Sequence, residues 1–273
     1  MQKCKVIAVA NQKGGVGKTT TTLNLGLGLL RAGKKVLLID FDPQGDLTTS
    51  LGFRNQDELE ITIKNLLEKC LKNVSIDKQE GVLKSKEGID IIPANIELEA
   101  LEISLSKFIN REKVLSKYIE QIKKEYDYIL IDCRPSLGLL TINALATADS
   151  VIIPVQAHYL PLKGMTQLIE TIDKTRTYIN PHLRIEGVLL TLADMQTNIA
   201  KTVEEALREN YGRKIKVYDT VIPAGVKAAE STIAGKSIYA YAKASKPAIA
   251  YENFTKEVLR DGKNARDRLA ERR

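Results

Sequence analysis

Short apolar runs alternate along this chain with longer segments in which apolar residues recur every three or four positions. The short runs are rich in β-branched residues, which is typical of strands buried on both faces of a sheet. They are Val6–Ala10, Val36–Ile39, Ile89–Ile92, Tyr128–Ile131, Val151–Val155 and Val188–Leu192. The segments of helical period are Lys18–Ala32, Glu97–Phe108, Glu112–Glu125, Leu139–Ala146, Gly164–Tyr178 and Ile199–Tyr211. The alternation predicts an α/β fold with one doubly wound, mostly parallel sheet flanked by helices.

No serine- or glycine-rich linker and no internal repeat divides the chain, so we expect a single domain over residues 1–273. Residues 55–86 are polar and weakly patterned, which indicates a helical insertion that covers one edge of the sheet. Residues 256–273 hold seven Lys and Arg against four Asp and Glu, and they predict a solvated basic helix.

The net charge of +7 favours polyanionic partners. Aromatic residues make up only 5% of the chain and tryptophan is absent, so any contact with nucleic acid is expected to involve phosphates.

The chain has no long apolar segment and its first residues lack the apolar core of a signal peptide, so we expect a cytoplasmic location. Cys4, Cys70 and Cys133 are too widely spaced for a disulfide framework or a Cys-x-x-Cys metal pair, and we expect packed, reduced thiols.

A glycine-rich segment follows the first predicted strand and leads into the first predicted helix. It reads Lys13, Gly14, Gly15, Val16, Gly17, Lys18, Thr19, Thr20. Glycines let backbone N–H groups converge on phosphate oxygens, and a helix N-terminus adds its positive dipole end. Lys18 is expected to reach the β- and γ-phosphates, and the Thr19 hydroxyl to bind Mg²⁺. The segment therefore predicts a site for a nucleoside triphosphate.

Carboxylates follow two further predicted strands. Asp40 and Asp42 come at the end of the run that begins at Val36, and Asp132 ends the run that begins at Tyr128. In an open α/β sheet, ligands bind at the carboxyl ends of the strands. Asp132 is expected to hold Mg²⁺ through a water molecule. Carboxylates beside a bound triphosphate predict that the triphosphate is hydrolysed.

These segments resemble three motifs of the ParA/MinD group of P-loop ATPases, and of the ParA-type partition ATPases in particular. The first is the loop at Lys13–Thr20, which carries a lysine five residues before the usual one. The others are Asp40–Gly45 and Asp132–Gly138. The resemblance spans about residues 5–260, with later landmarks at Val151–Gln156, Tyr159–Gly164, Gly187–Thr191, Thr197–Asn198 and Val221–Pro223.

The resemblance implies roles for individual residues. Lys13 would reach across a dimer interface to the phosphates of the partner's ATP, and Asp42 would orient the attacking water. Asp40 would lie near the water shell of Mg²⁺, and Pro223 beside the adenine. The cofactors implied are ATP and Mg²⁺.

The resemblance also implies a function. It describes an ATPase that forms ATP-dependent sandwich homodimers, binds DNA non-specifically on the nucleoid and is stimulated by a ParB-like centromere-binding protein. Such a protein would drive the partition of a plasmid, chromosome or mobile element. The alternative is a MinD-like or cargo-positioning ATPase that acts on a membrane or a protein assembly.

Other relatives of this group fit the sequence less well. Residues 258–270 have few bulky apolar side chains and are interrupted by Gly262, so stable membrane binding is not expected. The cysteine spacing does not suit an iron–sulfur cluster. An amidoligase of the P-loop type would need a further substrate pocket, for which the chain has little spare length.

Three positions depart from the ParA pattern. Arg134 replaces the first proline of the third motif, and it is expected either to pair with phosphate or the partner subunit or to face solvent. Gln196 and Ala224 occupy places where ParA relatives commonly have arginine. Nearby basic residues offer a replacement surface for DNA phosphates, namely Lys201, Arg208, Arg213, Lys214, Lys216, Lys227, Lys236, Lys243 and Lys246.

Overall fold

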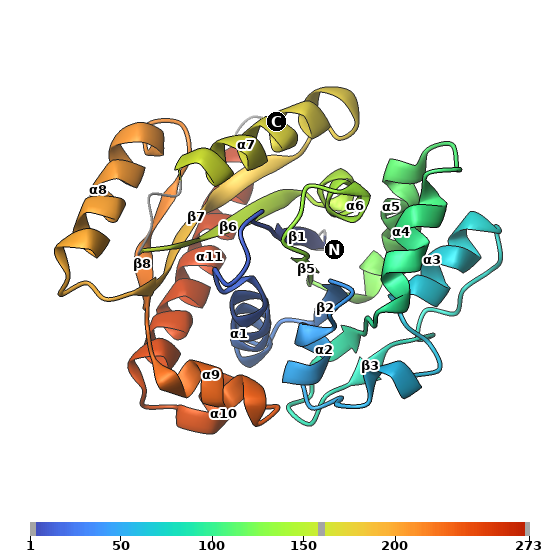
Figure 1. Cartoon of the computed structure of the whole chain (residues 1–273), viewed down its shortest axis with the longest axis horizontal. Helices are drawn as coiled ribbons and strands as arrows, with labels where there is room; N and C mark the ends of the chain where they lie inside the picture. The colour runs from blue at the N-terminus through green and yellow to red at the C-terminus, as the bar shows by residue number, and fades with distance from the viewer. Residues whose placement is uncertain (1–3, 158–161, 271–273) are drawn as a thin grey trace.

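The computed structural model describes residues 4–157 and 162–270 and is built on one eight-stranded sheet (Figure 1). The strand order is β3-β4-β2-β5-β1-β6-β7-β8. The strands are β1 (Lys5–Val9), β2 (Val36–Phe41), β3 (Leu83–Lys84), β4 (Asp90–Ile92), β5 (Tyr128–Cys133), β6 (Ser150–Gln156), β7 (Arg184–Ala193) and β8 (Val217–Pro223). Only β3 runs antiparallel to its neighbour in the described sheet. The predicted doubly wound, mostly parallel fold is confirmed.

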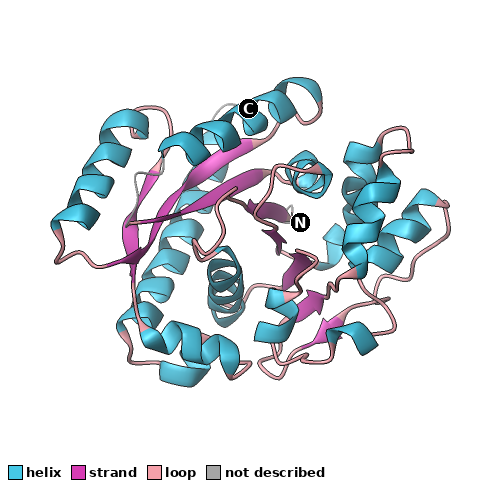
Figure 2. Ribbon diagram, viewed as in Figure 1, coloured by secondary structure: helices cyan, strands magenta, loops and turns pink. Residues whose placement is uncertain are grey.

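Helices cover both faces of the sheet (Figure 2). They are α1 (Lys18–Arg31), α2 (Asp46–Ser50), α3 (Ile63–Leu71), α4 (Glu97–Leu105), α5 (Val114–Ile122), α6 (Leu139–Thr147), α7 (Leu162–Tyr178), α8 (Asn198–Tyr211), α9 (Val226–Ile233), α10 (Ile238–Ala242) and α11 (Lys246–Ala270). Short 3₁₀ turns lie at Gln56–Glu58, Arg111–Lys113 and Lys123–Glu125.

The core has two layers, one on each face of the sheet. Apolar residues of α1, α10 and α11 form one buried cluster with the sheet, and those of α3 to α8 form the other. Along β1, Ile7 belongs to the first cluster, whereas Val6 and Ala8 belong to the second. This alternation follows from the pleat, which points successive side chains to opposite faces.

The edge strand β8 is not among the predicted strands, because the polar residues Asp219 and Thr220 interrupt its apolar run, and Asp219 is exposed. Helix α11 packs against this strand, and its Glu257 accepts hydrogen bonds from the backbone N–H groups of Asp219 (3.1 Å) and Thr220 (3.2 Å). That helix begins at Lys246, ten residues before the basic segment predicted from the sequence. An acidic side chain from a helix thus satisfies N–H groups that an edge strand otherwise exposes.

Residues 55–86, predicted as a helical insertion, contain α3 and the short strand β3, which pairs with β4 as the other edge of the sheet. The single-domain assignment of residues 1–273 stays a prediction. Tyr159 and Leu160 lie outside the described residues. The three cysteines are buried free thiols, as predicted. No helix in the described ranges is long and apolar enough to cross a membrane.

Candidate nucleotide-binding site

The glycine-rich loop lies at the carboxyl end of β1, in the centre of the sheet (Figure 1). Gly15 and Gly17 have φ angles of 70° and 80°, a conformation that favours glycine. Gly17 is the N-cap of α1 and supplies no side-chain hydrogen bond to the first helical turn. The N–H groups at this helix start are therefore available to an anion, which is the property that the sequence predicts.

Two side chains outside the predicted set fix the loop. Asn11 is buried; its Nδ2 donates to the carbonyl oxygen of Pro154 on β6 (2.7 Å), and its Oδ1 accepts from the N–H of Lys13 (3.0 Å). Thr191 on β7 has its hydroxyl 2.8 Å from the carbonyl oxygen of Val16. The loop is thus held by strands that flank β1 on one side. The contacts of Asn11 with Pro154 and of Thr191 with Val16 span 143 and 175 positions, so the local sequence does not predict them.

Lys18 is only 6% exposed, and its Nζ donates to the carbonyl oxygen of Lys13 (3.1 Å). Its side chain therefore spans the loop from the helix side. Burial lowers the pKa of Lys18, and the nearby Asp132 carboxylate opposes this shift. Lys13 itself is exposed.

Asp132, at the end of β5, is buried behind the loop. Its Oδ1 lies 3.2 Å from the donating hydroxyl of Thr22, whereas its Oδ2 has no hydrogen-bond partner among the described residues. Burial, together with the negative charge of Asp40, raises the pKa of Asp132. A buried carboxylate oxygen without a partner needs a cation or a donor to compensate it. The chemistry of this position fits a hydrated Mg²⁺ ion, which prefers oxygen ligands.

Asp40 and Asp42 lie in different environments. Asp40, the strand partner of Asp132, is fully buried and accepts from the N–H (2.8 Å) and hydroxyl (2.6 Å) of Thr48 on α2 and from the N–H of Asp42 (3.3 Å). Its oxygens therefore secure the turn between β2 and α2, and burial raises its pKa to about 7. Asp42 is half-buried and lines the cavity beside the loop, and its Oδ1 accepts from the N–H of Gln44 (3.1 Å).

A cavity of about 320 Å³ opens beside the loop and brings the predicted residues together. Gly14, Gly15, Gly17, Lys18, Thr19, Thr20, Asp42 and Pro223 line it. Val16 is buried beneath the loop, and Lys13, Asp40 and Asp132 do not line the cavity. The sequence did not predict its other lining residues, which include Leu192, Ile222, Ala228 and Tyr251. The cavity thus has a polar end at α1 and an apolar end at β7, β8 and α9.

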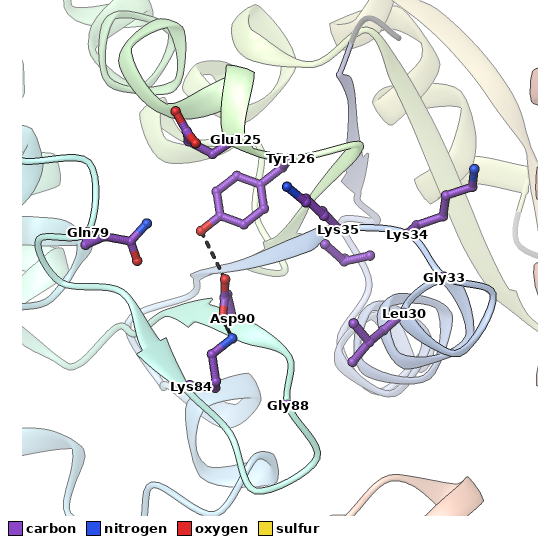
Figure 3. A pocket seen from close by; sticks show the side chains of 11 residues that line it. Leu30, Gly33, Lys34, Lys35, Gln79, Lys84, Gly88, Asp90, Glu125 and Tyr126 are labelled. Carbon is purple, nitrogen blue, oxygen red and sulfur yellow. Dashed lines mark hydrogen bonds and ion pairs between the residues drawn. The ribbon is translucent and has the colours of Figure 1, made fainter. Parts of the chain in front are cut away.

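A second hollow, of about 510 Å³, lies at the opposite end of β2, away from the glycine loop (Figure 3). Its lining includes Lys84, Asp90 and Tyr126. These polar groups pair with one another: Lys84 Nζ lies 2.6 Å from Asp90 Oδ1, and the Tyr126 hydroxyl donates to Asp90 Oδ2 (3.2 Å). It contains none of the predicted site residues, so the smaller cavity at the glycine loop is the better candidate.

Arg134 does not line the cavity and is only partly exposed. Its side chain is 22% exposed and pairs with Glu102 on α4. The neighbouring Pro135 does line the cavity. Of the alternatives left open by the sequence, the structure shows neither a fully exposed side chain nor one that lines the nucleotide cavity, because Arg134 pairs with Glu102 of its own chain.

The strand, glycine loop and helix, with aspartates at the ends of two neighbouring strands, define the class of P-loop nucleoside triphosphatases. The family model described as "AAA domain" matches residues 4–185. The sporulation initiation inhibitor protein Soj of Bacillus subtilis (strain 168) is 45% identical over 262 residues, which cover 94% of this chain and 99% of that protein. The chromosome partitioning protein ParA of Caulobacter vibrioides (strain NA1000 / CB15N) is 39% identical over 268 residues, 97% of each chain. This chain therefore belongs to the ParA/Soj family, as its motifs predict.

Solved structures share the same fold. A Mycobacterium smegmatis structure named cobyrinic acid a,c-diamide synthase, with bound ADP and magnesium, has a TM-score of 0.83 and 35% identity and covers 96% of both chains. A plasmid partition protein from Borrelia burgdorferi has a TM-score of 0.74 and 25% identity, covering 95% of this chain and 99% of its own.

Proposed function

We propose that this chain is an ATP-hydrolysing switch of the ParA type, whose ATP-bound form is a DNA-binding homodimer. The observation that carries the proposal is the cavity at Gly14–Thr20, which combines a helix N-terminus, a buried lysine and the half-buried carboxylate of Asp42. Relatives named for chromosome partitioning over nearly the whole chain support this reading.

ATP would occupy this cavity, with its phosphates at the glycine loop and its base at the apolar end near Pro223. Lys18 and the N–H groups at the start of α1 would bind the phosphate oxygens. Mg²⁺ would neutralise charge on the β- and γ-phosphates. Thr19 is its expected direct ligand, and Asp132 and Asp40 its expected partners through water. Asp132 has the unpartnered oxygen for this task, whereas Asp40 acts mainly by holding the turn that carries Asp42.

Asp42 would orient the water that attacks the terminal phosphate. It lines the cavity and follows directly on β2, so its carboxylate is placed by the strand rather than by a flexible loop. Phosphoryl transfer depends chiefly on positioning and on charge neutralisation, so Asp42 would act by holding the attacking water in place. Hydrolysis is expected to be slow and to depend on a stimulating partner.

Lys13 would complete the site of a second copy. It is exposed on the loop, and its N–H and carbonyl groups are engaged by Asn11 and Lys18, which fixes the backbone that presents its side chain. An exposed lysine supplied by each subunit to the other's phosphates would make dimerisation depend on ATP. ATP would then be the signal that assembles the dimer, and hydrolysis the signal that releases it.

The DNA surface would lie on the side of the molecule formed by α8, α9, α10 and the start of α11 (Figure 1). Of the predicted basic residues, Lys216 pairs with Glu257 (2.8 Å), Arg208 with Glu204 (2.9 Å) and Lys227 with Glu230 (2.9 Å). The remaining six are exposed and form no ion pair with another described residue: Lys201, Arg213, Lys214, Lys236, Lys243 and Lys246. These six are the stronger candidates for phosphate contacts.

In a cell, such a dimer would bind the DNA of the nucleoid, and a ParB-like centromere-binding protein would stimulate its ATP hydrolysis. The cargo would be a plasmid, a chromosome or a mobile element.

A second candidate function follows from the mycobacterial relative whose name describes an amide-forming synthase and which matches this chain over 96% of both lengths. That activity would consume ATP without needing either a dimer switch or DNA.

A gel shift with random-sequence DNA tests the proposal, with ATP or ADP and across a range of salt. The expected result is a shift with ATP only, which weakens steeply with salt because phosphate contacts release counterions. A variant with the six exposed basic residues changed to glutamine should lose the shift. Lys72→Gln with Lys107→Gln, which changes exposed lysines just after α3 and α4, should keep it. Absence of binding at every salt concentration would reject DNA as the partner and favour a protein cargo, a membrane or the synthase activity.

A further inference from the structure

The carboxylate of Glu102 on α4 holds both ends of the loop that follows β5. Its Oε2 accepts from Nη1 of Arg134 at 2.5 Å, and its Oε1 accepts from the backbone N–H of Leu140, the second residue of α6, at 3.1 Å. Glu99, one turn earlier on α4, lies 3.6 Å from Nη2 of Arg134 but is 53% exposed. We call the Arg134–Glu102–Leu140 arrangement the α4 clasp.

The loop closed by this clasp belongs to the nucleotide site. It begins two residues after Asp132, and its Pro135 lines the cavity. Within it, Ser136 donates its N–H to the carbonyl oxygen of Arg134 (2.9 Å). Gly138 lies so close to α4 that a Cβ at this position would be 2.5 Å from Glu102 Oε1. The loop is therefore shaped to accept the Glu102 carboxylate, and a larger residue at 138 would displace it.

The position of the clasp distinguishes it from an ordinary surface ion pair. Arg134 and Glu102 are 22% and 19% exposed, and Nε of Arg134 is buried with no hydrogen-bond partner in the described part of the chain. Exposed pairs contribute little to stability, and burying charge has a desolvation cost. A partly buried pair that leaves one donor unsatisfied is a costly way to gain stability, but it fixes one loop conformation through two charge-assisted hydrogen bonds.

We propose that Glu102 and Arg134 are positioning residues for ATP hydrolysis, which fix the 134–139 loop against α4 so that Asp132 and Pro135 keep their places at the nucleotide site. This inference rests on the proposed ATPase function. In the ParA-type motif the position of Arg134 is usually proline, a residue whose ring restricts the backbone directly. Here a side-chain contact with a separate helix supplies the restriction, so the site geometry depends on the position of α4.

Glu102→Ala tests the clasp, and Glu99→Gln is the matched control on the same helix. We expect Glu102→Ala to lower kcat about tenfold while the KM for ATP changes less than about twofold, because a misplaced loop impairs the transition state more than ground-state binding. Hydrogen exchange of the Leu140 amide should accelerate about tenfold, because its acceptor is removed. Glu102→Gln keeps an acceptor for Leu140 but not the charge, so it should protect this amide and lower kcat less. Glu99→Gln should behave as the wild type.

A double-mutant cycle separates positioning from general stability. If the clasp acts as one unit, Arg134→Ala combined with Glu102→Ala should lower kcat no further than the stronger single variant. Additive losses, or a folded Glu102→Ala protein with unchanged kcat and unchanged Leu140 exchange, would overturn the inference. A wild type that hydrolyses no ATP would instead reject the proposed function; the exchange of Leu140 would then still decide whether Glu102 holds the loop.

Discussion

Thr191 reaches from β7 to the glycine loop, with its hydroxyl 2.8 Å from the carbonyl oxygen of Val16 and 3.1 Å from that of Val155. One buried hydroxyl therefore connects the loop to two strands on one side of the site. The contact joins the glycine loop to β7, whose Thr191 and Leu192 both line the cavity. Nucleotide binding should thus be sensitive to a residue that offers no charge and no obvious catalytic group.

Thr191→Val should weaken ATP binding by about fivefold, because it keeps the shape of the side chain but leaves a buried carbonyl without its donor, at a cost of about 1 kcal/mol. Titration with a fluorescent ATP analogue measures this change. Thr171→Val on α7, where the hydroxyl donates only to the carbonyl of Gln167 in its own helix, is the control and should bind as the wild type. Unchanged affinity in Thr191→Val would show that the loop needs no support from β7.

Asp42→Ala should abolish ATP turnover while leaving ATP binding intact, and it should accumulate the ATP-bound dimer. The loss expected for removal of a water-positioning group is at least about a hundredfold in kcat. Phosphate release measures turnover, and light scattering measures the dimer. Asp46 also lines the cavity, at the start of α2, so Asp46→Ala is an informative comparison. If Asp46→Ala loses turnover and Asp42→Ala keeps it, the role assigned to Asp42 is wrong.

Substitutions of the two loop lysines, Lys13 and Lys18, should differ in their effect on ATP binding. Lys18→Ala removes the buried cation that spans the loop, so it should bind ATP at least about a hundredfold more weakly. Lys13→Ala removes an exposed side chain, and it should bind ATP within about threefold of the wild type. Equilibrium titration with the fluorescent analogue distinguishes them. A failure of Lys13→Ala to bind ATP would place this lysine in its own subunit's site rather than in the partner's.

The environment of Glu257 should make the free energy of unfolding depend on pH. Burial alone would raise its pKa, but hydrogen bonds from Lys216 and from the N–H groups of Asp219 and Thr220 lower it overall. A lowered pKa in the folded state means that the carboxylate stabilises the protein above its unfolded pKa of about 4.3, and that this stabilisation is lost as the pH falls through the lower folded value.

Glu257→Gln should therefore reduce the free energy of unfolding by about 2 kcal/mol at pH 7, because charged hydrogen bonds to β8 are weakened. The difference from the wild type should shrink as the pH falls below about 4. Urea unfolding at several pH values measures it. Glu252→Gln, which affects an exposed pair with Lys256 on the same helix, should change stability by less than about 0.5 kcal/mol. An effect of Glu257→Gln that does not vary with pH would contradict the assigned cause.

The phosphate end of the site was predictable because the glycine loop is one continuous segment and each of its residue groups lies at the end of a buried strand. Gly14–Thr20, Asp42 and Asp132 lie at the carboxyl ends of β1, β2 and β5, where an open parallel sheet binds ligands. The strands themselves were predictable because they are continuous apolar runs. The edge strand β8 was not, since Asp219 and Thr220 interrupt its apolar residues and their N–H groups bond to Glu257 of a distant helix.

The apolar end of the cavity and the α4 clasp required the structure. Leu192, Ala228 and Tyr251 are indistinguishable in sequence from ordinary core residues, and they meet only because β7, α9 and α11 converge. Arg134 pairs with Glu102, which lies 32 positions away on α4. Its charge alone left open contact with phosphate, contact with the partner subunit and exposure to solvent.

The central claim is that ATP bound at the Lys13–Thr20 loop assembles a dimer through Lys13. Light scattering of the wild type and of Lys13→Ala, each with ADP and with a non-hydrolysable ATP analogue at saturating concentration, tests it most directly. The account predicts a dimer for the wild type with the ATP analogue only, and a monomer for Lys13→Ala with either nucleotide although it binds both. A wild type that stays monomeric with the ATP analogue, or a Lys13→Ala protein that dimerises normally, would contradict it.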